Sequence, residues 1–393
     1  MHTRTLAFLL LAGHLLSVFP KLPGQRTYYP PSASEGGWRS LVDANADAAP
    51  EQKAAVLEKT GLHWDRLNDA WLYARQFVGR DSVLVIRRGW IAAEWSTSRR
   101  PMAIASCTKS LTAVSMAKLF DLSDSGRFST TIGIDDHAYR YLPESWAAEE
   151  PERKKIKVRH LMTMSSGLDA YDGPYGDLDA YAETVVTRRV VAPPGQVWEY
   201  SSAPVDLLSL IIEKVTAKTQ RDFFNQEISS AIGGPEVAWP HFQGHTGSSG
   251  GPGAGARFTA RDLARVAYLL LRKGVWDDGS GPKQIIGAGR VSMLSQPAAF
   301  LKDSTFRTSV FVKDPSAPNY YGYLFWTNRT QRALGPKVPK DTFFMHGYGK
   351  QACWIIPSLD MVIVRIGSKP RLNRLPDYFP EFLSRVMSAV VSR

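Results

Sequence analysis

The sequence has few of the features that mark disulfide-stabilised, membrane-spanning or nucleic-acid-binding proteins. Its 393 residues include only two cysteines, Cys107 and Cys353, too few for a disulfide framework, and we expect two buried thiols rather than one bridge. After the first 19 residues, no apolar run is long enough to span a bilayer. The net charge is +11, but apart from a short run at 153–157 the basic residues are scattered, which argues against a nucleic-acid partner.

Signals for cofactors and metals are also missing. No glycine-rich phosphate loop or dinucleotide fingerprint follows a predicted strand. His241 and His245 are four residues apart, but they lie in an irregular glycine-rich stretch with no carboxylate motif nearby, so we predict neither a metal nor a cofactor. Residues 247–251 formally match Gly-x-Ser-x-Gly, yet a nucleophile elbow needs a strand before it and a helix after it, so Ser249 is rejected as a nucleophile.

The N-terminus is typical of an exported protein. Residues 1–19 combine an early arginine with two leucine-rich runs, the layout of a secretory signal peptide. We interpret residues 1–24 as a signal peptide or, because no clear small-x-small cleavage site follows, an N-terminal anchor. The expected location is the periplasm or the extracellular space, with no membrane span after cleavage. Residues 25–60 form a Pro-, Ser- and Ala-rich arm with a helix-like end.

Periodicity predicts an α+β fold in one domain covering residues 61–393. A helical pattern over 67–77 precedes two strands, and three strands and a helix end the chain. Between about 110 and 275 the pattern is mainly helical, and Thr259 and Asp262 are spaced as a capping box. We therefore expect an antiparallel sheet sandwiched by helices, with an inserted all-α lobe. The predicted strands are 82–86, 90–95, 343–346, 352–356 and 361–366, and the other predicted helices are 111–120, 160–164, 205–215, 259–273 and 378–391.

The most informative short motif is Ser-x-x-Lys at the start of a predicted helix, formed by Ser106 and Lys109. Positions three apart share a helix face, so the hydroxyl and the amine can come within hydrogen-bond reach. A serine hydroxyl needs such a neighbour to become a nucleophile at neutral pH. Alone the motif is weak, because a capping serine with a surface lysine has the same spacing.

Further stretches, in a fixed order along the chain, lift the motif above chance. With them, the sequence from about 65 to 390 resembles the serine β-lactamase-like superfamily, which includes class C β-lactamases, DD-peptidases, esterases and aminohexanoate-dimer hydrolases. The stretches that carry the resemblance are Arg87-Arg88-Gly89, Asp135-Asp136, Tyr141-Leu142-Pro143, 160–168, 193–202, 259–264, Tyr320-Tyr321-Gly322-Tyr323 and His346-Gly347-Tyr348-Gly349.

The resemblance implies roles for five groups. Ser106 would attack a carbonyl carbon, Lys109 would hold or exchange its proton, and Tyr200 would act as the base that later protonates the leaving group. A tyrosine can do so only if nearby cations lower its pKa, and Lys109 is the candidate. The backbone N–H groups of Ser106 and Gly349 would bind the oxyanion.

Two departures from the family pattern bear on the substrate. Ser202 stands where β-lactamases usually have asparagine, and His346-Gly347-Tyr348 stands where they have Lys-Thr-Gly. His346 could polarise the site or bind a substrate carboxylate, or it could be a histidine satisfied within the sheet. Tyr171, Asp172 and Trp198 lie in loops beside the motifs and are candidates for the acyl pocket, although exposed loop aromatics and a solvated carboxylate would fit the same positions.

These observations predict an exported serine hydrolase that cleaves a small ester or amide substrate through an acyl-Ser106 intermediate. A β-lactamase or DD-peptidase acting on β-lactams or peptidoglycan peptides is the second interpretation, because the changes at Ser202 and His346 weaken it. A catalytically silent binding or sensor module is the third, and the joint presence of Ser106, Lys109 and Tyr200 argues against it.

Overall fold

The computed structural model describes residues 27–77, 81–96, 100–170, 186–239, 241–242, 245–246, 255–309, 312–367 and 377–391. Its centre is a six-stranded antiparallel sheet in the order β11-β12-β13-β14-β1-β2. The strands are β1 (Asp81–Arg87), β2 (Trp90–Ser96), β11 (Trp326–Thr327), β12 (Phe343–Gly347), β13 (Gln351–Ile356) and β14 (Met361–Gly367). Strands from both ends of the chain thus meet where β14 pairs with β1, as the sequence predicted.

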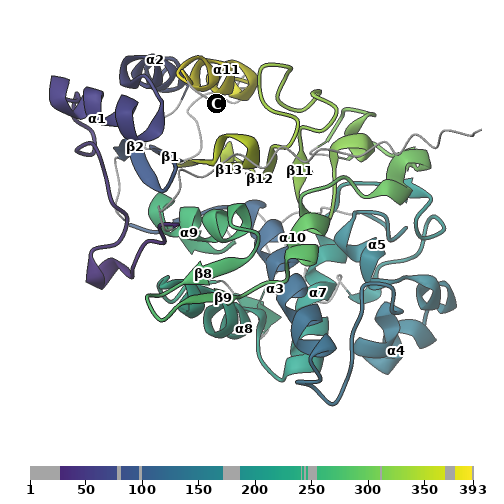
Figure 1. Ribbon diagram of the computed structural model, residues 1–393. Coiled ribbons are helices and arrows are strands. Elements are labelled where there is room, and N and C mark those ends of the chain that lie inside the picture. Colours follow the sequence, from purple (N-terminus) through teal and green to yellow (C-terminus); the bar gives the residue numbers. More distant parts are fainter. Residues whose placement is uncertain are drawn as a thin grey trace, which may run out of the picture.

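Three helices cover one face of the sheet: α1 (Pro50–Thr60), α2 (Trp64–Ala74) and α11 (Phe379–Ser388). Figure 1 shows α2 and α11 side by side. Aromatic side chains fill this layer, because large rings bury the most apolar area per residue. Trp71 stacks on Trp95 with ring centroids 5.5 Å apart, and Trp354 meets Phe379 edge-on at 4.8 Å.

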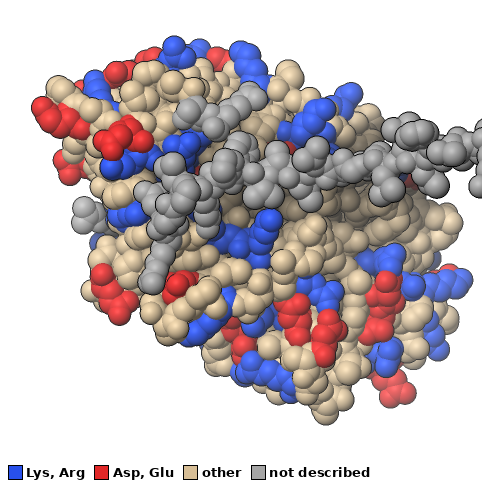
Figure 2. All heavy atoms as spheres, viewed as in Figure 1, with Lys and Arg blue, Asp and Glu red and all other residues tan. Residues whose placement is uncertain are grey.

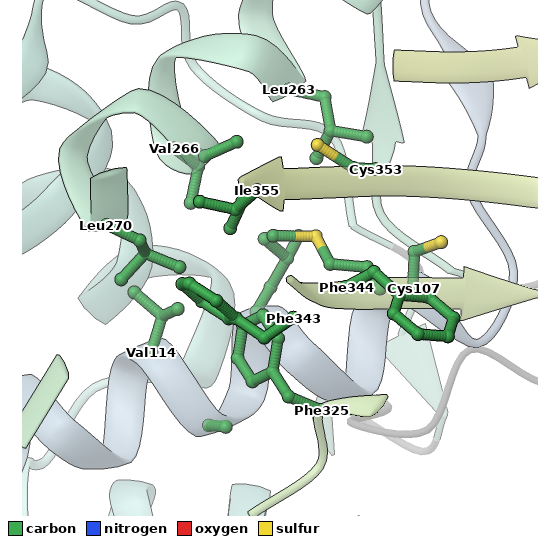
Figure 3. Close-up of a cluster of buried hydrophobic side chains, with 14 of the residues drawn as sticks. Cys107, Val114, Leu263, Val266, Leu270, Phe325, Phe343, Phe344, Cys353 and Ile355 are labelled. Atoms are coloured by element: carbon green, nitrogen blue, oxygen red, sulfur yellow. The ribbon is translucent and has the colours of Figure 1, made fainter. Parts of the chain in front are cut away.

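Two long helices, α3 (Cys107–Asp124) and α9 (Ala260–Leu271), cover the opposite face. Thr259 caps α9 by accepting a hydrogen bond from the Asp262 N–H, which is half of the expected capping box. In Figure 3, apolar side chains of α9 point at β13, and the two cysteines lie in the same core. Both cysteines are buried and unpaired, which confirms the expectation of two thiols.

The remaining described elements lie mostly between β2 and β12 in sequence. The helices are α4 (Glu144–Ala148), α5 (Val158–Met162), α7 (Ala203–Thr216), α8 (Gln220–Phe224) and α10 (Ala288–Leu294). The short strands are β3 (Met102–Ala103), β4 (Val197–Trp198), β5 (His241–Phe242), β6 (His245–Thr246), β7 (Arg257–Phe258), β8 (Val275–Asp277), β9 (Pro282–Gln284) and β10 (Thr305–Phe306). The α+β class is confirmed. The insertion, expected as an all-α lobe, is mainly helical but also contains short paired strands. None of the helices within the described ranges is both long and apolar enough to cross a bilayer.

The N-terminal arm closes the outer edge of the sheet. Main-chain hydrogen bonds join Leu41 and Arg39 to Ile91 of β2, which satisfies groups that an exposed edge strand would leave open. Arg265 of α9 donates to the carbonyls of Pro30 and Ile232, each over 3.0 Å, and so ties the arm to the helices. On the molecular face shown in Figure 2, basic and acidic side chains are interspersed.

Candidate active site

The candidate nucleophile stands at a sharp turn that enters α3. Ala105 has a φ of 49°, in the left-handed region that non-glycine residues rarely adopt. Ile104 anchors the turn by donating its N–H to the Ala256 carbonyl at 3.0 Å. Ser106 follows as the N-cap residue of α3 and is partly exposed, so its hydroxyl is presented beside the positive end of the helix.

Lys109 brings the predicted groups together. Its side chain is only 1% exposed, and its Nζ donates to Ser106 Oγ at 3.1 Å and to Ser202 Oγ at 3.2 Å. The same Nζ lies 5.1 Å from the centroid of the Tyr200 ring. Ser202, which replaces the family's usual asparagine, therefore still contacts the lysine. A buried amine that touches the hydroxyl is the arrangement that proton exchange requires.

Tyr200 is held in place by backbone contacts on both sides and by aromatic rings. The N–H groups of Glu199 and Ser201 donate to the carbonyl and the sulfur of Met164, at 2.9 and 3.5 Å. The Tyr200 ring stacks on Trp326, with centroids 5.9 Å apart and an interplanar angle of 22°. Contacts with Met164 therefore hold the backbone on both sides of Tyr200, and Trp326 packs against its ring.

Tyr321 lies at the edge of the Tyr200 ring, with centroids 6.2 Å apart. Burial raises the pKa of Tyr321 well above its ordinary value, and the neighbouring Tyr200 acts in the same direction. Tyr321 therefore stays neutral at physiological pH and serves as packing for Tyr200. Tyr321 and Met164 lie in two of the stretches that carry the sequence resemblance, 320–323 and 160–168, but their contacts with the Tyr200 segment were not predicted. No sequence motif pointed to Trp326.

Strand β12 lies directly against the start of α3. A Cβ built on Gly347 would come within 2.5 Å of the Ile104 carbonyl oxygen and 3.1 Å of the Ser106 nitrogen. Only glycine fits such an approach between two backbones. Gly349 follows in the turn after β12 with a φ of 75°, a conformation that glycine also favours. The end of β12 and the nucleophile therefore lie close together, which binding of an oxyanion by the N–H groups of Ser106 and Gly349 would require.

His346 faces away from this contact. Its ring meets Phe379 of α11 with centroids 5.4 Å apart, because neighbouring residues of a strand point to opposite faces and Gly347 faces α3. Burial lowers the pKa of His346 to about 4, with Lys350 and Arg365 acting in the same direction and Asp377 against them. A neutral histidine on the α11 side matches the second interpretation of this residue, a histidine packed within the sheet.

The remaining predicted site residues divide between the core and the undescribed segments. Trp198 is completely buried, its ring lies against Phe306 and Tyr321, and its indole N–H has no hydrogen-bond partner among the described residues. Trp198 therefore packs beside the Tyr200 ring in the core and does not line an open pocket. Tyr171, Asp172 and Ser249 lie outside the described residues.

Comparison with known proteins agrees with this geometry. The Beta-lactamase family profile matches residues 74–377, more than half of the chain. The chain belongs to the Beta-lactamase family and is a serine hydrolase. No curated protein sequence matches it.

Solved structures share the fold at low sequence identity. A β-lactamase/D-alanine carboxypeptidase from Yersinia pestis is 17% identical with a TM-score of 0.61, covering 86% of this chain and 99% of the other. A candidate 6-aminohexanoate-dimer hydrolase from Bacillus anthracis is 21% identical with a TM-score of 0.61, covering 82% and 80%. A family VIII carboxylesterase is 17% identical with a TM-score of 0.57, covering 83% and 96%. At such identities the likeness establishes the fold and leaves the substrate open.

Proposed function

We propose that the protein hydrolyses a carboxylic ester or a small amide through an acyl-Ser106 intermediate. The observation that carries the proposal is the hydrogen bond of 3.1 Å between the buried Lys109 amine and the Ser106 hydroxyl. Ser202 and Tyr200 complete a compact polar set around the same amine. Such a set can take a proton from the serine and return it to a leaving group.

The chemistry proceeds in two steps. Ser106 Oγ attacks the carbonyl carbon while its proton passes to the Lys109 and Tyr200 pair, and the resulting oxyanion receives hydrogen bonds from the N–H groups of Ser106 and Gly349. The bond to the leaving alcohol or amine breaks, and the leaving group takes the proton. Water then attacks the acyl-serine, gives a proton to the same pair, and releases the carboxylic acid with a restored hydroxyl on Ser106.

The replacements at Ser202 and at His346-Gly347-Tyr348 favour an ester or amide substrate over a β-lactam. The asparagine and the Lys-Thr-Gly stretch grip the β-lactam amide and carboxylate in the enzymes that this sequence resembles. Here the serine hydroxyl is used by Lys109, and the histidine ring faces α11. The histidine ring is therefore turned away from a ligand at Ser106.

The test compares hydrolysis of p-nitrophenyl butyrate by the wild-type protein and by Ser106→Ala. We expect activity in the wild type and its loss in the variant, together with a mass increase on Ser106 after brief exposure to the ester. A variant that keeps the activity would mean that the nucleophile lies elsewhere, and Ser249 is the next residue to replace. Failure of a fluorophosphonate to label the folded wild type would favour a silent binding module, and faster hydrolysis of nitrocefin than of the ester would favour a β-lactamase.

We also propose that the protein is exported. The leucine-rich segment at residues 1–19 is the support for this location. Expression of the whole chain with a C-terminal tag, followed by fractionation and N-terminal sequencing, tests it. We expect a shortened protein outside the cytoplasm, and an intact N-terminus in the cytoplasmic fraction would contradict export.

A further inference from the structure

Arg365 is a charged residue in the middle of the sheet. It lies in β14, paired with Val83 of β1 on one side and Ala352 of β13 on the other, and its side chain is 1% exposed. Moving a guanidinium out of water is costly, so its burial needs a specific reason. Its Nη1 crosses β13 and donates to the carbonyl oxygen of Gly349 at 2.6 Å.

The acceptor of this bond belongs to the turn that carries the second oxyanion donor. The turn joins β12 to β13, and both Gly349 and Lys350 adopt a positive φ, at 75° and 63°. Glycine in such a turn has wide conformational freedom, so the direction of its N–H depends on outside restraints. Gln351, the next residue, also makes two hydrogen bonds to the backbone of Gly367, at 2.6 and 2.8 Å. The end of β14 thus holds both the turn and the start of β13.

The charge of Arg365 also acts on the residue that follows the nucleophile. Cys107 directly follows Ser106, and burial raises the pKa of its thiol, whereas the positive charges of Lys109 and Arg365 act in the opposite direction.

We propose that Arg365 is a positioning residue that fixes the Gly349 turn in the geometry required for oxyanion binding. The inference rests on the proposed function, because it assigns a task within that same reaction. An apolar side chain at this position would pack without desolvation cost, so a positioning task is one reason for a guanidinium here.

Arg87 provides a matched control at the opposite end of the same strands. It lies in β1, pairs with Met361 and is also 1% exposed. Its guanidinium donates to the carbonyls of Leu359 and Gly61 at 2.9 and 3.1 Å, away from the β12–β13 turn. Arg87→Met and Arg365→Met therefore remove the same buried group from the same sheet, and only the second removes a bond to Gly349.

The experiment measures p-nitrophenyl butyrate hydrolysis and inhibition by phenylboronic acid, which forms a tetrahedral adduct on a serine. Active sites are counted by fluorophosphonate titration, so that misfolded protein is excluded. For Arg365→Met we expect kcat/KM to fall roughly 10- to 100-fold with little change in KM, and the boronate inhibition constant to rise by a similar factor. Arg87→Met is expected to keep both values.

Should Arg365→Met not fold, Arg365→Lys replaces it, with an expected 3- to 10-fold effect, on the order of one lost hydrogen bond, because lysine keeps the charge and loses the planar fork. Wild-type kinetics and boronate binding in whichever variant folds would overturn the inference, as would an equal loss in Arg87→Met. If the wild type neither hydrolyses the ester nor becomes labelled at Ser106, the proposed function fails first and this inference fails with it.

Discussion

Gly347 and His346 are neighbours in β12, yet they face opposite layers of the molecule. On the Gly347 side lie the turn at Ala105 with its positive φ and a buried lysine between two serine hydroxyls. On the His346 side lie aromatic side chains of α11, with Trp354 and Phe379 in contact at 4.8 Å. The α3 face carries the reactive polar groups and the unfavourable backbone geometry, and the α11 face is mainly apolar, with Arg365 as a buried charge on that face. The comparison indicates that the reacting groups lie on one side of a single sheet and most of the apolar packing on the other, with Arg365 reaching from the second side to the Gly349 turn. This division can be tested from either side.

The largest effect is expected from Lys109→Met on the α3 side. The variant removes the amine that contacts Ser106 and Ser202 but keeps the length of the side chain. We expect kcat/KM for p-nitrophenyl butyrate to fall about 10³-fold, because proton transfer loses its partner, while the midpoint of urea unfolding changes little. A variant within tenfold of wild type would remove Lys109 from the mechanism.

The second-largest effect, a loss of folding stability, is expected from a substitution on the α11 side. Phe382 of α11 is 1% exposed, and the centroid of its ring lies 6.0 Å from that of the Trp354 ring. Phe382→Ala should lower the free energy of unfolding by about 3–4 kcal/mol through lost burial and a cavity. Leu72→Ala, at a position 41% exposed, is the control and should cost less than about 0.5 kcal/mol. Ester hydrolysis per active site should be unchanged in both variants, and a loss in Phe382→Ala would break the separation of the two faces.

A smaller effect on activity is expected from Gly347→Ala. The added methyl group would sit 2.5 Å from the Ile104 carbonyl and must push β12 away from α3. We expect kcat/KM to fall roughly 10- to 100-fold, because a shift of about 1 Å misplaces the oxyanion donors. The matched control is Gly289→Ala in α10, where a Cβ meets no atom within 4 Å. Equal kinetics for both variants would show that close contact at Gly347 is unimportant.

The smallest effect is a change of stability with pH. Burial lowers the pKa of both His160 and His346 to about 4, so the unfolded chain, with its ordinary value of 6.5, binds more protons between those two values. Stability contributed by the neutral rings is complete above pH 6.5 and is lost as the pH falls towards 4. We expect each ring to contribute on the order of 1 kcal/mol, since both are partly exposed. Urea titrations at pH 7 and 4.5 measure the free energy of unfolding of the wild type, His160→Asn and His346→Asn. Identical pH dependence of that free energy in all three proteins would exclude the two rings as its cause.

The sequence predicted the secondary structure well where side chains alternate regularly. Strands over 361–366 and 352–356 correspond to β14 and β13 within one residue, and the helix expected over 259–273 corresponds to α9. Spacing also placed Ser106 and Lys109 on one helix turn. The face of His346 was left open, because alternation places His346 and Gly347 on opposite sides of the strand but does not say which side packs against α3.

Other features required tertiary structure, because they depend on contacts between distant segments. Local patterns contain no information about which strand Arg365 reaches across. They also do not predict the packing of Trp326 on Tyr200, since Trp326 lies more than a hundred residues away in a stretch with no motif. The sequence by itself determined the elements, the family resemblance and the Ser-x-x-Lys pair, because these are properties of neighbouring residues. The tertiary structure decided which polar groups meet in the core, because burial and close approach arise only when distant segments pack together.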